Sequence, residues 1–377
     1  MGIMNRKNLI ILMIDGGRWD NSRKSPFYQK LKDKSLSFSQ SITYGPHTIA
    51  AMHAVFSGSY GTRTGTNSYW STHNFRREKF KTLTEYLKDE NYYTICDMIN
   101  KLLVPKQGFD EFLVYNEEKD DLIERHCIML ENMKKKYDKG QNFFAYLQFG
   151  DIHTGIMNEV LKPYDNFSEE YFNNINLNRE LYDKLFEKSS NYLEKILEKI
   201  SSLGLDTESL ILIMSDHGIS VGEKIGERAY GAFCYDYTLR TFAYFLYPNV
   251  FPMEINQQVR TIDFMPTILD YLKIKPDSNY ELMDGQSLFP LVNGDNIKEI
   301  PAFSESGNPL QSKEPPEEPN ISSIRTSKWK LIFNEYDNTK ELYNLKNDSE
   351  EKINLAGNNL EIENVLWNQL EAIRLKI

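Results

Sequence analysis

The sequence is poor in cysteine and contains no long apolar run. Its three cysteines, Cys96, Cys127 and Cys234, are far apart in the chain and stand in apolar surroundings. A disulfide framework of the kind that stabilises small secreted domains is therefore not expected. The apolar run near the N-terminus, residues 9–14, is too short for a secretory signal or a membrane span. We expect a cytoplasmic protein that does not insert into a membrane.

Positive charge is also scarce. The chain has 44 Lys and Arg against 54 Asp and Glu, which gives a net charge of −10. A surface that binds nucleic acid needs clustered Lys and Arg to match the phosphates, so this class of partner is excluded. A small anionic substrate would have to meet a local positive site. A bound metal ion would supply one.

Hydrophobic residues that could build a large core, in contrast, are plentiful. The 377 residues are 40% hydrophobic and 13% aromatic, far from the composition of disordered chains. The length exceeds the usual size of a single core and predicts one large α/β domain with a smaller appendage.

Three short apolar runs predict buried strands of an α/β sheet. They are residues 8–14, 143–149 and 210–214. Helical patterns separate them, as is typical of α/β proteins. Ligand sites of open α/β sheets lie beyond the carboxyl ends of the strands. We therefore expect Asp15, Asp151 and Asp216, which follow the three runs, to converge.

Other segments predict the rest of the organisation. Helical spacing covers residues 168–203 and ends at Gly204, and residues 83–87 predict a short helix. Residues 308–320 are rich in Pro, Glu and Ser and predict a loop or hinge. Strand-like segments follow at 323–334 and 341–345, and a helix at 361–375. We predict a catalytic domain at residues 1–307 and an α+β subdomain, a small antiparallel sheet with one helix, at 308–377.

Four residues predict a metal site with a reactive hydroxyl. Asp15 is followed by two glycines that permit a tight turn, although capping of a βα turn explains it equally well. Thr48 precedes a helical run, where the helix dipole favours an anion; a plain N-cap is the alternative. Asp216 and His217 leave one strand end together. Three oxygens and one nitrogen suit Mn²⁺ or Zn²⁺ better than Ca²⁺.

The remaining polar candidates would act on the substrate. His153 follows the second predicted strand and is placed to bind a substrate oxygen or to protonate a leaving group, with an ordinary polar loop as the alternative. Lys101, Lys224 and Arg228 are candidates to neutralise a phosphate or sulfate, although such residues are more often solvated charges. We interpret the four other histidines as packing or surface residues: His47, His53, His73 and His126.

Taken in order, these segments resemble the sulfatase-like branch of the alkaline phosphatase superfamily over nearly the whole chain. The opening D-x-x-R-x-D resembles the first metal segment of that family, and the S-D-H-G at 215–218 resembles the second. The stretch that begins at Thr48 and runs into H-A-V-F-S-G-S-Y-G resembles the nucleophile segment, and the D-I-H at 151–153 resembles the family's D-P-H. E-L-Y-N-L-K-N-D, near the C-terminus, resembles a signature of the family's C-terminal subdomain. The resemblance implies an alkaline phosphatase-like central sheet flanked by helices.

Departures from the family pattern change the expected chemistry. Formylglycine sulfatases convert a Cys or Ser, and Thr48 cannot undergo that conversion. Ala50 and Met52 replace the Pro and Arg of the family's C-x-P-S-R, and Gly16 replaces the second Asp of its Asp-Asp pair. The combination is similar to phosphoethanolamine and phosphoglycerol transferases and to phosphodiesterase and phosphonate hydrolase relatives, in which a threonine forms a phospho-enzyme.

The hypothesis from the sequence is therefore a metal-dependent hydrolase of phosphate esters. One divalent ion, with Mn²⁺ or Zn²⁺ favoured and Ca²⁺ or Mg²⁺ possible, would be held by Asp15, Thr48, Asp216 and His217. Thr48 would attack a phosphodiester, phosphomonoester or phosphonate ester. The alternatives are a transferase that passes a phospho-substituent to a glycan, a hydrolase of sulfuric esters, and a non-catalytic relative that binds a ligand.

Overall fold

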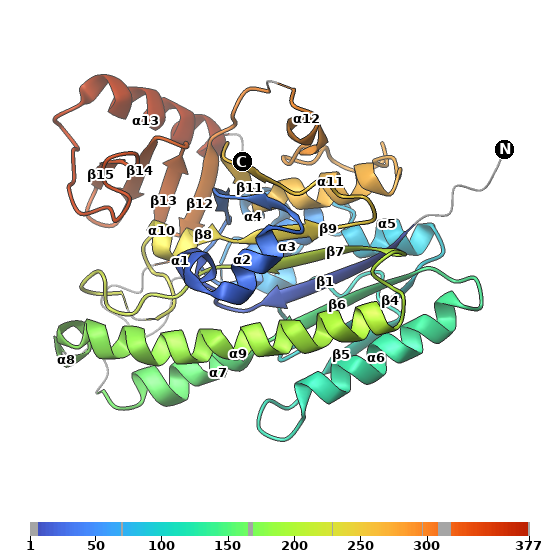
Figure 1. The fold of residues 1–377 in the computed structure, drawn as a ribbon. Coiled ribbons are helices and arrows are strands. Elements are labelled where there is room, and N and C mark those ends of the chain that lie inside the picture. Colours follow the sequence, from blue (N-terminus) through green and yellow to red (C-terminus); the bar gives the residue numbers. More distant parts are fainter. Residues whose placement is uncertain are drawn as a thin grey trace.

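A sheet of eight strands forms the centre of the protein (Figure 1). The computed structural model describes residues 7–68, 71–164, 169–227, 229–295, 297–307 and 318–375. The strand order is β10-β2-β9-β7-β1-β6-β4-β5. The strands are β1 (Asn8–Ile14), β2 (Leu36–Phe38), β4 (Tyr93–Met98), β5 (Glu111–Val114), β6 (Phe143–Phe149), β7 (Ser209–Ser215), β9 (Ala243–Leu246) and β10 (Met253–Ile255).

The five strands from β7 to β5 are parallel, and β9 joins β7 antiparallel. The three predicted strands are confirmed as β1, β6 and β7, which lie next to one another with β1 in the middle. Such parallel strands are apolar along most of their length because helices cover both faces of the sheet.

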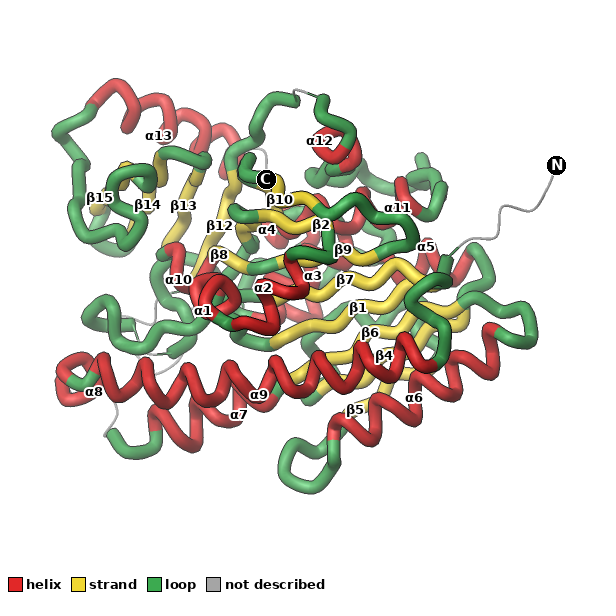
Figure 2. Tube along the Cα trace, in the orientation of Figure 1, coloured by secondary structure: helices red, strands yellow, loops and turns green. Residues whose placement is uncertain are grey.

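Helices pack on both faces of the sheet (Figures 1 and 2). Ile10 and Leu12 of β1 point into a core shared with α6 (Leu122–Tyr137) and α9 (Ile175–Ser202). Leu9 and Ile11 point to the opposite side, into a core shared with α3 (Thr48–Ser57), α5 (Leu83–Asp89) and α11 (Phe264–Tyr271). The predicted α/β fold class is confirmed.

Shorter helices complete this part of the chain. They are α1 (Trp19–Lys24), α2 (Pro26–Lys32), α4 (Gly61–Thr64), η1 (Ser71–Asn74), α7 (Asp151–Gly155), η2 (Ile156–Leu161), α8 (Glu169–Asn173), α10 (Asp236–Leu239), η3 (Thr261–Asp263) and α12 (Phe289–Val292). The single helix predicted at 168–203 is two helices, α8 and α9, which Asn174 separates; residue 168 lies outside the described residues. Within the described ranges, no helix combines the length and the apolar character that a membrane crossing requires.

Two smaller sheets stand beside the central one. The first has the order β11-β3-β8 and consists of β3 (Ser41–Ile42), β8 (Arg240–Thr241) and β11 (Val259–Arg260). The second is antiparallel, with the order β12-β13-β14-β15, and consists of β12 (Ala302–Ser306), β13 (Ile321–Arg325), β14 (Trp329–Asn334) and β15 (Thr339–Asn344). Helix α13 (Leu360–Arg374) packs on this second sheet through Leu366 and Leu370.

The C-terminal sheet was foreseen, but its details differ from the prediction. Residues 323–334 form two strands joined by a turn rather than one strand-like segment, because the chain reverses between Arg325 and Trp329. Strand β12 comes before residue 308 and pairs with β13. The predicted catalytic domain therefore contributes one strand to this sheet. Residues 308–317 of the predicted hinge lie outside the described residues. The domain division at residue 308 stays a prediction.

A buried network of charges joins the C-terminal sheet to the central part of the chain. Asp236, at the start of α10, accepts from Arg325 of β13 at 2.8 Å and from Lys330 of β14 at 2.9 Å. Lys330 also lies 2.8 Å from Glu351, whose other carboxylate oxygen accepts from the Asp236 backbone N–H at 2.7 Å. Burial would raise the pKa of Asp236, but the two cations outweigh it and hold this pKa well below its ordinary value.

We predict that Asp236→Ala destabilises the protein by about 3–5 kcal/mol, because it leaves the buried Arg325 without a carboxylate and Lys330 with Glu351 alone. Chemical denaturation measures this change. The matched control is Lys352→Ala, which breaks the exposed ion pair between Lys352 and Glu350 and should leave the unfolding curve unchanged. Equal behaviour of the two variants would contradict the assigned role of the network.

Candidate metal centre and catalytic site

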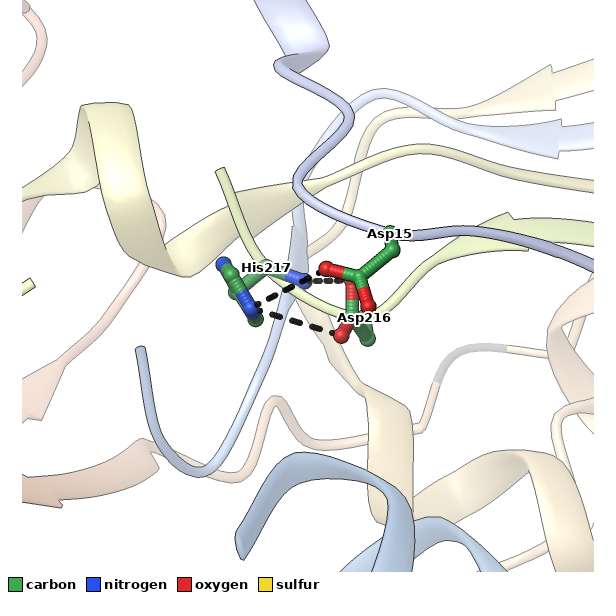
Figure 3. Close-up of side chains that lie close together, drawn as sticks. All are labelled: Asp15, Asp216 and His217. Atoms are coloured by element: carbon green, nitrogen blue, oxygen red, sulfur yellow. Dashed lines mark hydrogen bonds and ion pairs between the residues drawn. The ribbon is translucent and has the colours of Figure 1, made fainter. Parts of the chain in front are cut away.

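The metal centre begins with the alignment of strand ends. In the parallel register Ile14 pairs with Ser215, so the next residues, Asp15 and Asp216, emerge side by side. Ligand atoms of Asp15, Asp216 and His217 all lie within 4.8 Å of one another (Figure 3). Nε2 of His217 is 3.4 Å from Oδ2 of Asp216 and 3.8 Å from Oδ1 of Asp15. Two strand ends therefore supply two oxygens and one nitrogen to a single point.

Each carboxylate has one oxygen fixed by the protein and one buried oxygen without a hydrogen-bond partner. Oδ1 of Asp216 accepts from the backbone N–H groups of Gly16 at 3.0 Å and His217 at 2.9 Å. Oδ2 of Asp15 accepts from Nε2 of Gln148 at 2.7 Å. Oδ1 of Asp15 and Oδ2 of Asp216 are the unpartnered atoms. Burial, reinforced by the charge of Asp15, raises the pKa of Asp216 to about 6 against the opposing effect of His217. Buried carboxylate oxygens without a hydrogen-bond partner are suited to bind a divalent cation.

The imidazole of His217 is oriented for ligation. Its Nδ1 lies 2.7 Å from the carbonyl oxygen of Gly218, and a carbonyl only accepts, so Nδ1 carries the proton. Nε2, the ring nitrogen that a metal ion would bind, then faces the two aspartates. A backbone partner of this kind is what fixes the tautomer of metal-binding histidines.

The conformation of the turn after β1 in this chain favours a glycine at residue 16. Gly16 has a φ of +70°, and a Cβ at this position would stand 2.9 Å from Cγ1 of Ile219. Its carbonyl oxygen accepts from the Tyr182 hydroxyl at 2.8 Å. The absence of a side chain at residue 16 thus lets the segment after His217 pack against the end of β1.

Thr48 reaches the same point from the other face of the sheet. It is the first residue of α3, with its Oγ1 3.3 Å from Oδ2 of Asp15 and 3.3 Å from Nε2 of His217. The N-cap is His47, whose Nδ1 accepts from the Ala50 N–H at 3.4 Å. The alternative interpretation of Thr48 as a plain N-cap therefore does not hold. A buried hydroxyl at a helix N-terminus lies where the helix dipole favours negative charge.

His153 lies at the rim of the site. Its Nδ1 is 3.7 Å from Oδ1 of Asp15, and its side chain is 38% exposed. Its ring packs against that of Tyr230, with 5.1 Å between the centroids. Burial acts to lower the pKa of His153, but the carboxylates of Asp15 and Glu117 outweigh it and raise this pKa to about 9. A protonated imidazole at the rim is suited to donate a proton.

The third predicted acid does not join the group. Asp151 is not among the residues whose ligand atoms gather within 4.8 Å. The register explains this result, because Phe149 pairs with Ile14 and Gly150 is therefore the residue level with Asp15. Asp151 comes one residue later, at the start of α7.

The predicted substrate-binding cations lie in different settings. Lys101 is exposed in the turn after β4. Nζ of Lys224 donates to the carbonyl oxygen of Glu351 at 2.5 Å and lies 4.5 Å from the ring centre of Tyr235. It is thus engaged with the C-terminal part of the chain. Arg228 lies outside the described residues. The substrate-binding roles of these three residues stay predictions.

Sequence reasoning missed two residues of the site, Gln148 and Tyr230. A signal for Gln148 was present, since it is the polar residue in the otherwise apolar run FFAYLQF. Tyr230 gave no comparable signal because it lies in an irregular segment, where its hydroxyl donates to the carbonyl oxygen of His153 at 3.2 Å.

Comparison with known families agrees with this geometry. The sulfatase family model matches residues 7–274. The chain belongs to the sulfatase family. A second model, for the C-terminal region of N-sulphoglucosamine sulphohydrolase, matches residues 229–376. The predicted recognition as a sulfatase-like protein is confirmed.

Two curated relatives resemble parts of this sulfatase-family chain. A low-salt glycan biosynthesis sulfotransferase of Haloferax volcanii is 24% identical over 230 residues, which are 58% of this chain and 48% of the relative. A sulfatase of Formosa agariphila is 26% identical over 236 residues, which are 55% of this chain and 40% of the relative. The chain thus matches less than half the length of either relative.

Solved structures share the fold over nearly the whole chain. A 2-O glycosaminoglycan sulfatase superposes with a TM-score of 0.79 at 17% identity, covering 98% of this chain and 92% of the other. An enzyme in complex with its substrate D-glucosamine-2-N,6-O-disulfate gives 0.74 at 16% identity, with 98% and 97% covered. A phosphonate monoester hydrolase of Silicibacter pomeroyi gives 0.72 at 16% identity, with 98% and 96% covered.

We predict that Asp216→Asn makes the metal-free protein more stable, by on the order of 1–3 kcal/mol, because it removes one of two facing buried carboxylates. The same change should abolish the rise in melting temperature that Mn²⁺ or Zn²⁺ gives the unaltered protein. Thermal unfolding with chelator and with added metal measures both effects. An exposed control, Asp33→Asn, should change neither. A metal response that survives in Asp216→Asn would contradict the assigned ligand.

Proposed function

We propose that this sulfatase-family protein is a metal-dependent hydrolase of phosphate-type esters, namely phosphodiesters, phosphomonoesters or phosphonate esters, with Thr48 as the nucleophile. One observation carries the proposal. The Thr48 hydroxyl lies 3.3 Å both from a carboxylate oxygen of Asp15 and from Nε2 of His217, at the buried N-terminus of α3. A hydroxyl in this place has a proton acceptor beside it and an electrostatic setting that favours its anion.

The proposed metal ligands are Asp15, Thr48, Asp216 and His217. Three oxygens and one imidazole nitrogen favour Mn²⁺ or Zn²⁺, with Ca²⁺ or Mg²⁺ as less suited occupants. A bound divalent ion supplies positive charge that lowers the pKa of a nearby hydroxyl and polarises an ester oxygen.

The protein's own residues carry the proposed steps. The Thr48 oxygen attacks the phosphorus atom, and Oδ2 of Asp15 is the acceptor placed to take its proton. As the bond between Thr48 and phosphorus forms, the bond from phosphorus to the leaving oxygen breaks, and His153 gives that oxygen a proton. Water then attacks the phosphorus atom of the phospho-threonine and gives a proton to His153, while the bond from phosphorus to the Thr48 oxygen breaks. The proton held by Asp15 returns to that oxygen, which restores the hydroxyl. We propose that Lys101, Lys224 and Arg228 share the charge of the phosphoryl oxygens.

Threonine is the reason for preferring phosphate over sulfate. Formylglycine sulfatases convert a Cys or Ser at the nucleophile position, and a threonine is excluded from that conversion. The likeness to a phosphonate monoester hydrolase is compatible with this preference at the level of the fold. Hydrolysis of sulfuric esters remains the family's ordinary reaction and is the first alternative that a substrate panel must test.

Transfer to a glycan is a second candidate reaction. One curated relative of the chain is named as a sulfotransferase of glycan biosynthesis. In such a reaction a sugar hydroxyl, instead of water, would release the group from Thr48. Product analysis with and without sugar acceptors separates transfer from hydrolysis. The cytoplasmic location expected from the sequence stays a prediction.

We predict that Thr48→Ala lowers turnover of the best phosphate-type ester by about a thousandfold or more while metal is still bound, because the attacking atom is lost. The assay is a panel of aryl phosphate mono- and diesters, phosphonate esters and sulfate esters, with metal content measured on the same samples. Thr84→Ala removes another buried threonine hydroxyl, from α5, and should retain full activity. Mass spectrometry of the quenched enzyme should find a phosphoryl group on Thr48.

Activity confined to sulfate esters would refute the preference for phosphate. Full activity of Thr48→Ala would refute the nucleophile. A metal-loaded protein that turns over nothing in the panel would favour the non-catalytic alternative.

We predict that His153→Gln affects esters according to their leaving groups. Alkyl esters, whose leaving oxygen needs a proton, should slow by about 10²–10⁴-fold, whereas nitrophenyl esters, which leave as stable anions, should change little. Turnover of a matched alkyl and nitrophenyl pair measures the contrast. Exposed His73 supplies the control His73→Gln, which should alter neither rate. Equal losses on both esters would contradict a role as proton donor.

A further inference from the structure

One glutamine side chain lies buried among apolar residues of the central sheet. Gln148 belongs to β6 and is completely buried. Phe144 and Tyr146, on the same face of this strand, belong to the apolar core against α3. An amide in such surroundings must satisfy its donors and acceptor inside the protein, since water is excluded. The partners that it takes therefore indicate its role.

The two ends of the Gln148 amide contact two different strand ends. Its Oε1 accepts from the backbone N–H of Ile99, just after β4, at 3.0 Å. Its Nε2 donates to Oδ2 of Asp15, just after β1, at 2.7 Å. The hydroxyl of Tyr115 donates to the carbonyl oxygen of Gln148 at 3.1 Å, which also fixes its backbone. The side chain thus bridges from β4 to β1 across its own strand.

The backbone partner sets the direction of the amide. The Ile99 N–H only donates, so the atom that faces it must be the amide oxygen. The NH₂ group is therefore forced toward Asp15. Oδ2 of Asp15 then receives Gln148 and the Thr48 hydroxyl, whereas Oδ1 keeps no hydrogen-bond partner.

We infer that Gln148 is a positioning residue of the metal centre, which rotates the Asp15 carboxylate so that Oδ1 is presented to the cation. This inference rests on the metal-dependence of the proposed function. Gly16, the neighbour of Asp15, has no side chain that could do this work. His153 is 3.7 Å from Oδ1, beyond ordinary hydrogen-bond distance. Gln148 makes the shortest side-chain hydrogen bond that the structure gives to Asp15.

A purely structural role is the competing explanation, because the bond to Ile99 also fastens the end of β4. Two substitutions separate the roles. Gln148→Met keeps the length of the side chain and removes both hydrogen bonds. Ile99→Pro removes only the bond to Ile99, because proline has no N–H, and leaves the Gln148 amide its donor to Asp15. The matched control is Tyr146→Phe, which removes a buried hydroxyl without a hydrogen-bond partner from the same face of β6.

The experiment measures the affinity for Mn²⁺ and for Zn²⁺ by competition with a chelating indicator, first on the unaltered protein and then on the three variants. Thermal unfolding in chelator confirms that each variant is folded. Gln148→Met should bind metal about tenfold to a hundredfold more weakly, the range found when an outer partner of a metal ligand is lost, and Ile99→Pro should bind it more tightly than Gln148→Met. Tyr146→Phe should stay within about twofold of the unaltered protein.

The outcomes are distinct. Retention of the original affinity by Gln148→Met would overturn the inference, and an equal loss in Gln148→Met and Ile99→Pro would assign the role to the Ile99 bond and overturn it too. If Gln148→Met does not fold, Gln148→Leu takes its place in the comparison with Tyr146→Phe. An unaltered protein that binds neither metal would refute the metal centre of the proposed function itself, and the inference with it. Metal binding that is insensitive to Gln148 would refute the inference alone.

Discussion

Two carboxylates buried against each other at the ends of adjacent strands are the constraint on which the site depends. Asp15 and Asp216 are both fully buried, and each has an oxygen without a hydrogen-bond partner. Burial, with the charge of Asp15 added to it, raises the pKa of Asp216 to about 6. Such a pair lowers the stability of the fold unless a cation joins it. The arrangement is therefore explained by what it binds rather than by what it contributes to folding.

The rest of the molecule is arranged to hold that pair. Parallel register aligns the ends of β1 and β7, and α3 delivers the Thr48 hydroxyl from the opposite face. Outer contacts then fix each group: Gly218 fixes the ring of His217, the backbone of Gly16 fixes Asp216, and Gln148 fixes Asp15. Each of these contacts leaves one metal-binding atom of the side chain directed toward the centre of the site. The site therefore has its geometry before a ligand binds.

Much of this could be predicted from the sequence because the strongest signals are local. The apolar runs that became β1, β6 and β7 end in polar residues, and the rule for strand ends placed Asp15, Asp216 and His217 together. Where the prediction failed, the missing information was the register and the packing. Asp151 lies one residue beyond the position that is level with Asp15. This difference follows from the register of the strand pairing and not from residue type.

Contacts between side chains that lie far apart in the chain could not be predicted from the sequence either. The ammonium group of Lys224 contacts the carbonyl oxygen of Glu351, more than a hundred positions later, a partner that the sequence does not indicate. Gln148 resembled an isolated polar residue in a strand, and only the neighbouring strands reveal its two partners. Asn174 divides a helical pattern that by its spacing alone appears continuous.

The charge network around Asp236 has a consequence for how the polypeptide matures. Its acid lies in the middle of the chain, whereas its cations Arg325 and Lys330 come from strands near the C-terminus. During synthesis the central sheet emerges from the ribosome while Asp236 still lacks its counter-ions. The segment that carries Asp236 reaches its final state only after β13 and β14 have been translated. The N–H of Gly218, next to His217, donates to the carbonyl oxygen of Thr238 in α10 at 2.7 Å, so the metal centre adjoins the part of the chain whose charges are completed by β13 and β14.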